Sequence, residues 1–96
     1  MKLVLLPSAW DDLAEGFHFY EAQSSGLGDY FRESLIAEIE RLPPVAGVHR
    51  RVFGSHRALA GKFPFAIYYT IADDTLLVRA VLDCRRDPAW LRKKLK

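Results

Sequence analysis

The stretch from Lys62 to Pro88, KFPFAIYYTIADDTLLVRAVLDCRRDP, decides the fold that the sequence predicts. In its first ten residues a single apolar face recurs at every second position, namely Phe63, Phe65, Ile67, Tyr69 and Ile71. A period of two over this length predicts a β-strand. Residues 72–75, ADDT, favour a tight turn because aspartate side chains bond to the backbone two residues on. A second strand follows at once, so the stretch predicts an antiparallel hairpin.

Alternation along the second strand divides its residues between two faces of the predicted sheet. The apolar face takes Leu76, Val78, Ala80 and Leu82. The second face of the hairpin then carries Tyr68, Thr70, Arg79 and Asp83. Residues 84–88, CRRDP, leave the sheet from the same end as Asp83, so this end concentrates arginines.

The length of 96 residues predicts a single domain, residues 1–96. Half of the residues are hydrophobic and 27% are charged, which is typical of a folded protein. No apolar run approaches the roughly 20 residues that cross a bilayer, and the apolar opening ends too early, at Pro7, for a signal peptide. We therefore expect a cytoplasmic protein. The only cysteine, Cys84, excludes an internal disulfide and is interpreted as a structural or incidental thiol.

Charge is distributed unevenly along the chain. Residues 1–44 hold three basic and eight acidic side chains, and residues 79–96 hold seven basic and two acidic ones. The chain is thus acidic at the front and basic at the back, although its net charge is only +2. This asymmetry indicates either contact with nucleic acid or an acidic partner, or a solvated basic tail without a partner.

The front half predicts a strand followed by two helices. Lys2–Leu6 is apolar on both faces, so we expect it inside the sheet rather than at an edge. Ser8 is the expected N-cap of a helix that extends to about Gln23, with Asp11 in the capping-box position. The second helix is expected over residues 29–42 and stops at two prolines. Because the intervening loop is short, the helices should form an antiparallel hairpin.

The back half adds the remaining elements. Residues 45–55 are expected to be a loop with a short extended piece at 51–53, and residues 56–61 the first strand of a meander. Asp87 and Pro88 have the form of an N-cap and first-turn proline for a helix over residues 89–95, with Leu91 and Leu95 facing inward. The prediction is an α+β, two-layer domain: N-terminal strand, helical hairpin, three-stranded antiparallel meander and short C-terminal helix, with the second sheet face partly open.

Several segments in this order resemble the ParE/RelE superfamily of toxins from type II toxin–antitoxin systems, above all its ParE-like or plasmid-stabilisation branch. They are FYEAQ (19–23), GLGDYF (26–31), FPFAIYY (63–69), DDTLLVRAVL (73–82) and RRDPAW (85–90). The resemblance covers nearly the whole chain, with one departure: Asp83 stands where the branch often has histidine. It implies the same α+β fold and a toxin that inhibits growth by binding and poisoning DNA gyrase. It also implies a cognate antitoxin from the adjacent gene, whose acidic C-terminal segment wraps the toxin.

An alternative from the same resemblance is a RelE-like, ribosome-dependent and metal-independent mRNA endoribonuclease. Such enzymes carry paired lysines in the first meander strand, where this chain has Arg57 and Leu59, and an arginine where it has Ala66. Arg86 matches a late arginine of that set, but no tyrosine or histidine follows Tyr69. The candidates for catalysis are therefore Arg57, Arg86 and His56, without a clear acid–base pair. A binding protein is favoured over an enzyme.

No cofactor or metal site is predicted. The three histidines are scattered, the Asp73–Asp74 pair is interpreted as turn residues, and the Gly26–Gly28 segment follows no strand.

The residues proposed to contact the target or the antitoxin lie mostly in the basic back half. They are Arg57, Tyr68, Arg79, Asp83, Arg85, Arg86 and Trp90. Of Arg85 and Arg86, one is expected to pair with nearby carboxylates and the other to contact the target. Four further aromatic residues are more than two short helices need for their core contacts. They either form a partner surface or fill the space between helices and sheet: Trp10, Phe19, Tyr30 and Phe53.

Overall fold

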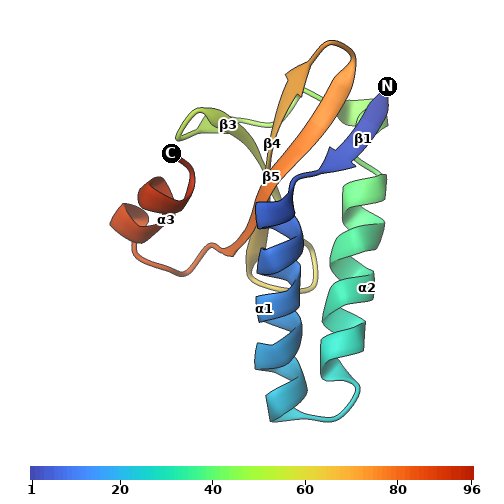
Figure 1. Ribbon diagram of the computed structural model, residues 1–96, viewed down its shortest axis with the longest axis vertical. Coiled ribbons are helices and arrows are strands. Elements are labelled where there is room, and N and C mark those ends of the chain that lie inside the picture. The colour runs from blue at the N-terminus through green and yellow to red at the C-terminus, as the bar shows by residue number, and fades with distance from the viewer.

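Five strands form one mixed sheet in the order β1-β5-β4-β3-β2 in a computed structural model that describes residues 1–96 (Figure 1). The strands are β1 (Lys2–Leu5), β2 (Arg51–Val52), β3 (Ser55–Leu59), β4 (Phe65–Ala72) and β5 (Thr75–Asp83). The helices are α1 (Pro7–Gln23), α2 (Leu27–Glu40) and α3 (Pro88–Lys94), with a 3₁₀ turn, η1, at Pro43–Val45. The α+β class and the order of elements predicted from the sequence are confirmed.

The β4–β5 hairpin is the centre of the sheet, as predicted. Its turn consists of Asp73 and Asp74, which have φ values of 50° and 58°. Two successive left-handed residues match the twist of the flanking strands, and aspartate adopts that conformation more readily than most residues. The interpretation of this acidic pair as turn residues is therefore confirmed.

The side-chain alternation predicted for β5 is wrong beyond Val78. Tyr69 lies opposite Val78 and Tyr68 lies opposite Ala80, so Arg79 has no residue opposite it. This β-bulge adds one residue to β5, so the side chains of β5 after the bulge point to the opposite face from the one that simple alternation predicts. Asp83 therefore lies opposite Phe65, on the face that the helical hairpin covers, and not on the second face.

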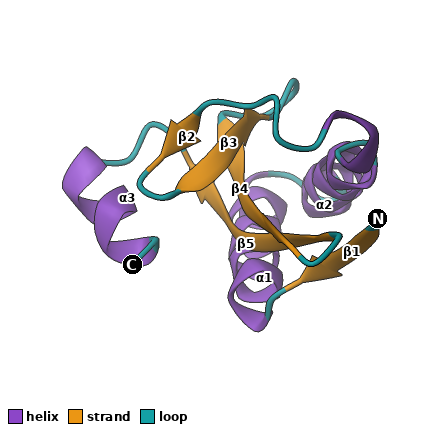
Figure 2. Ribbon diagram, turned by 90° about the horizontal axis from the view of Figure 1, so that it is seen from above, coloured by secondary structure: helices purple, strands orange, loops and turns teal.

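Two clusters of buried side chains lie on opposite faces of the sheet. Figure 2 shows the helices that cover them, with α3 on one side of the strands and the α1–α2 hairpin on the other. The α1–α2 hairpin covers one face, where Leu13, Phe31 and Ile67 are among the buried residues. On the other face Leu91 and Leu95 of α3 pack against the short side chains of the sheet and against Tyr68. The inward orientation of both leucines is confirmed. The expectation of a partly open face is wrong at Tyr68, which α3 buries completely.

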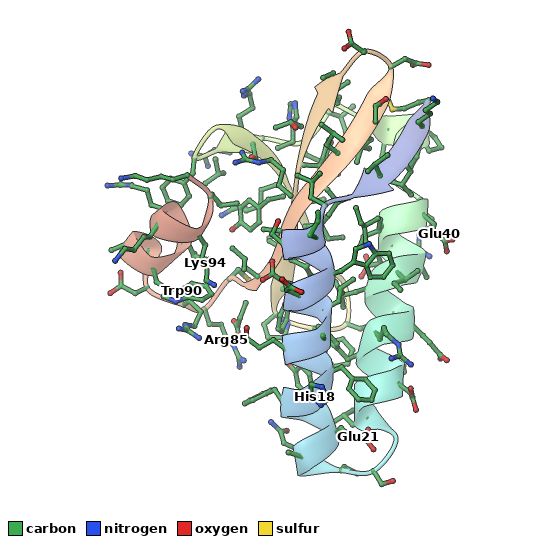
Figure 3. All side chains as sticks on the ribbon, viewed as in Figure 1. His18, Glu21, Glu40, Arg85, Trp90 and Lys94 are labelled. Carbon is green, nitrogen blue, oxygen red and sulfur yellow. The ribbon has the colours of Figure 1, made fainter.

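The helical hairpin packs closely because α1 has a glycine at its contact with α2. A Cβ atom on Gly16 would lie 2.5 Å from ring atoms of Phe31. On the same helix Tyr20 belongs to the buried cluster, whereas Phe17 lies beneath the guanidinium of Arg32. Near the end of α1 the Glu21 carboxylate accepts hydrogen bonds from the N–H groups of Gly26 and Gly28 in the connection between the helices. Figure 3 shows Glu21 beside this loop.

The N-terminal strand β1 is an edge strand, contrary to the expectation. It pairs in parallel with β5 alone, and Val4 is 41% exposed. The chain turns at Pro7 into α1, so no other strand reaches the outer side of β1. Ser8 is likewise not an N-cap, because α1 already begins at Pro7 after Leu6.

The other local predictions are closer to the structure. The extended piece expected at 51–53 is β2, and the first meander strand is β3. The Asp87 carboxylate accepts a hydrogen bond from the N–H of Ala89 at 2.8 Å, with Pro88 in the first turn, which confirms the predicted start of α3.

Candidate functional site

The first turns of α1 replace a strand along the free edge of β5. The last backbone hydrogen bond between β5 and the segment that contains β1 is donated by the N–H of Leu6 to the carbonyl of Val78. Beyond that point the Ser8 hydroxyl donates to the carbonyl of Arg79 at 2.6 Å. The Asp12 carboxylate accepts from the N–H of Val81 at 2.9 Å. Two polar side chains thus satisfy backbone groups that would otherwise lack partners.

A cleft of about 190 Å³ opens next to this contact, between α1, the end of β5 and the start of α3; we name it the α1–α3 cleft. Its apolar surface comes from Phe19, Phe65, Val81, Leu82 and Trp90. Phe19 is 54% exposed, so one wall offers an aromatic ring to solvent. The cleft joins a hydrophobic floor to charged groups, which is the usual composition of a recognition site.

Burial raises the pKa of Asp12 from 3.8 to about 6, against the lowering effect of its hydrogen bond from Val81 and of the Lys94 cation. Glu15, one turn further along α1, and Asp11 raise it further through charge repulsion. Glu15 also lines the cleft and forms no ion pair. Sequence reasoning did not single out either Asp12 or Glu15. The only local signal is their spacing of three residues on one helix, which does not reveal that β5 lies beside them.

Asp83 and Arg85 form a closed pair at the rim of the cleft. The guanidinium of Arg85 donates from Nε and Nη2 to the two carboxylate oxygens, at 3.0 and 2.7 Å. These hydrogen bonds lower the pKa of Asp83 below its usual value. Of the two neighbouring arginines, Arg85 is therefore the one with an intramolecular carboxylate partner.

Arg86 differs from Arg85 because no carboxylate pairs with it. Its guanidinium carbon lies 3.9 Å from the centre of the Trp90 ring, and the Lys94 ammonium lies 5.5 Å from the same centre. Figure 3 shows Arg85, Trp90 and Lys94 on the side of the molecule where α3 faces α1. Of the predicted contact residues, Asp83, Arg86 and Trp90 line the cleft together.

Arg57, Tyr68 and Arg79 lie elsewhere, on the face that α3 covers. Tyr68 is fully buried and its hydroxyl has no hydrogen-bond partner. Burial raises the pKa of Tyr68, and the Arg57 cation opposite it partly offsets that effect. Arg79 donates to the hydroxyl of Ser55 at 2.9 Å and to the carbonyl of Leu95 at 3.1 Å. Arg79 therefore holds α3 against the sheet, and Tyr68 lies beneath that helix.

The candidates for catalysis are not brought together. His56 lies opposite Tyr69 on the helical side of the sheet, where its ring stacks on that tyrosine and its Nδ1 bonds to the carbonyl of His49. Arg57, the next residue, is on the other face, and Arg86 is beyond the far end of β5. The structure does place His49 beside Tyr69, at 2.5 Å from Nδ1 to the hydroxyl, a contact that sequence spacing did not reveal.

Three of the four surplus aromatics are exposed. Trp10, Phe19 and Tyr30 are 51%, 54% and 47% exposed, so they do not fill the space between helices and sheet. Phe53, in contrast, packs against the α3 side of the sheet. The chain contains no group of three or more potential metal ligands, and none of its helices has the length and apolar character that a membrane span requires.

Comparison with solved structures finds the same fold in a toxin–antitoxin system. One chain from the chromosomal ParDE system of P. aeruginosa superposes with a TM-score of 0.68 over 84% of this chain and 92% of that chain, at 11% sequence identity. No protein-family model matches the sequence, and no curated protein matches it either. The chain therefore has a ParE-like fold.

Proposed function

We propose that this protein is the toxin of a type II toxin–antitoxin pair of the ParE type, and that it acts in the cytoplasm by binding a cellular target. The observation that carries the proposal is the shared fold with a chain of a ParDE system over 84% of the present chain. The order of the sequence segments that resemble ParE-like toxins supports the same conclusion independently of the superposition.

The surface of the protein supports action by binding. Trp10, Phe19 and Tyr30 expose large aromatic side chains on the helical hairpin, and such groups are enriched where proteins meet. Arg86 presents a cation without a carboxylate partner next to Trp90. We infer that these groups contact the antitoxin, the target, or each in turn, so that one partner masks the surface needed by the other.

DNA gyrase is the target that the ParE-like resemblance implies. The alternative, a ribosome-dependent endoribonuclease, needs a general acid, a general base and cations around one phosphate. His56, Arg57 and Arg86 lie on different faces or at different ends of the sheet, which favours the binding function.

The test is to induce the protein alone in bacteria and to follow DNA, RNA and protein synthesis separately. A block of DNA replication with an SOS response, together with inhibition of purified gyrase, is the expected result. A prompt translation block with cleaved mRNA, abolished by Arg86→Ala, would identify the endoribonuclease instead. If induction affects none of these processes and growth continues, the toxin proposal fails.

The proposed antitoxin is tested by expressing the protein with the product of the adjacent open reading frame. We expect a complex that survives purification and that relieves growth inhibition. Reversing the charge with Arg86→Glu should slow association and weaken its dependence on salt, because unpaired surface charges steer encounter.

A further inference from the structure

We propose that the α1–α3 cleft receives a lysine or arginine side chain from the antitoxin segment, so that this segment, although acidic overall, carries one basic anchor. This inference rests on the proposed function and deepens it by assigning a recognition chemistry to one place on the surface.

The shape of the cleft fits the stem of a long side chain. Its floor consists of Phe65 and Val81, and the exposed ring of Phe19 forms one wall. Aliphatic stems of lysine and arginine cover apolar surface while their charged ends reach polar groups. An aromatic wall also attracts a cation through the charge distribution of its ring.

The wall formed by α1 supplies the negative charge. One oxygen of Asp12 accepts the Val81 N–H, and the structure gives its other oxygen no partner. Glu15 has neither a hydrogen bond nor an ion pair from its side chain. These two carboxylates therefore offer unoccupied acceptors beside an apolar floor.

The other charged residues of the cleft lie away from the α1 wall. Asp83 is neutralised by two hydrogen bonds from Arg85, whereas Arg86 lies against Trp90 and has no carboxylate partner. A cation that enters the cleft thus meets its complementary charge on α1, whereas the acidic remainder of the segment can contact Arg86 and the basic residues of α3. The chain's own Lys94 affects Asp12 only through space and does not form an ion pair with it.

The size of the cleft favours one side chain of a larger partner over a free small molecule. Its volume of about 190 Å³ is below the roughly 300–1,000 Å³ of typical small-molecule sites. Interfaces concentrate their affinity in a few anchors that enter such pockets. The exposed Phe19 continues the cleft outward, so the flanking residues of the segment have a surface on which to lie.

The first experiment measures binding of the antitoxin, produced with this protein and then separated, to the double variant Asp12→Asn/Glu15→Gln. Both substitutions preserve side-chain shape and remove charge. The matched control is Glu33→Gln/Glu40→Gln, which removes two carboxylates from the exposed side of α2; Figure 3 shows Glu40 on the opposite side of the molecule from Trp90. We expect the cleft variant to bind roughly 10- to 100-fold more weakly, as for loss of a buried charge partner, and the control to bind within about 2-fold of the original protein.

The outcomes separate the two proposals. If the antitoxin binds the cleft variant as tightly as the original protein, the cleft assignment is wrong and the toxin–antitoxin proposal stands. If no neighbouring product binds the original protein, both proposals fail. If the cleft instead mediates self-association that the double variant abolishes, the occupant is a second copy and the assignment to the antitoxin is wrong.

A second experiment tests the charge preference without the antitoxin. Benzylamine and benzoate carry the same ring with opposite charges, and each is titrated into labelled protein while amide signals are followed by NMR. We expect benzylamine, but not benzoate, to shift the signals of Asp12, Phe19 and Val81, and we expect the double variant to lose this response. Equal shifts with both probes, or none with benzylamine, would contradict a cation-selective cleft.

Discussion

The substitution Asp12→Asn should stabilise the protein at neutral pH and have little effect at pH 4. The Asp12 carboxyl has a pKa of about 6 in the folded protein against 3.8 for an unperturbed aspartate, mainly because it is buried beside β5. Between these values the folded state holds a proton that the unfolded chain has released. Raising the pH through this window therefore lowers the free energy of unfolding, and the loss is complete above about pH 6.

The magnitude follows from the difference between the two pKa values. Taken in full, it corresponds to a destabilisation of about 3 kcal/mol once both states are ionised. Because Asp12 is only partly buried, solvent screening reduces this figure, and we expect roughly 1–2 kcal/mol. Asparagine retains an oxygen that can accept the Val81 N–H, so the variant removes the charge while it keeps the hydrogen bond.

The assay is urea denaturation of both proteins at pH 7.5 and at pH 4, followed by tryptophan fluorescence. The variant should be more stable by the stated amount at pH 7.5, and the gap should shrink to about 0.5 kcal/mol or less at pH 4, where the folded state of the original protein is protonated and the unfolded state is close to its own pKa of 3.8. Glu40→Gln, which removes an exposed carboxylate remote from the cleft, is the control for net charge. A gap that does not depend on pH, or a variant that is less stable at pH 7.5, would refute the reasoning.

Three further substitutions test the packing. Ile67→Ala should cost about 2–5 kcal/mol because Ile67 is 1% exposed, whereas Ile71→Ala, at a residue 39% exposed on the same face of β4, should cost less than about 1 kcal/mol; equal losses in chemical denaturation would mean that the difference in burial along this face is wrong. Gly16→Ala should lower the thermal midpoint despite the better helix propensity of alanine, since overpacking against Phe31 costs about 1–3 kcal/mol; a raised midpoint would contradict the close approach. Tyr68→Phe should be neutral or stabilising by up to ~1 kcal/mol because it removes a buried hydroxyl without a partner, and a clear loss of stability would reveal an unseen hydrogen bond.

The candidate site was only partly predictable. Sequence reasoning identified Asp83, Arg86 and Trp90 as contact residues, and the structure places all three around one cleft. It did not identify the α1 wall, since the environment of Asp12 depends on a hydrogen bond to a residue 69 positions away. It also grouped Tyr68 with the accessible residues, whereas α3 buries that side chain completely.

What the sequence determined by itself are the features whose causes are local. The period of two in β4, the Asp73–Asp74 turn and the cap at Asp87 each depend on residues a few positions apart, and each was predictable. Only the tertiary structure decided the edge position of β1, the bulge at Arg79 and the packing of α3 over Tyr68. These features depend on which distant segments compete for a sheet edge or a sheet face. Burial and backbone pairing over the whole chain decide which segment takes each position. A local sequence pattern carries no information about these distant segments.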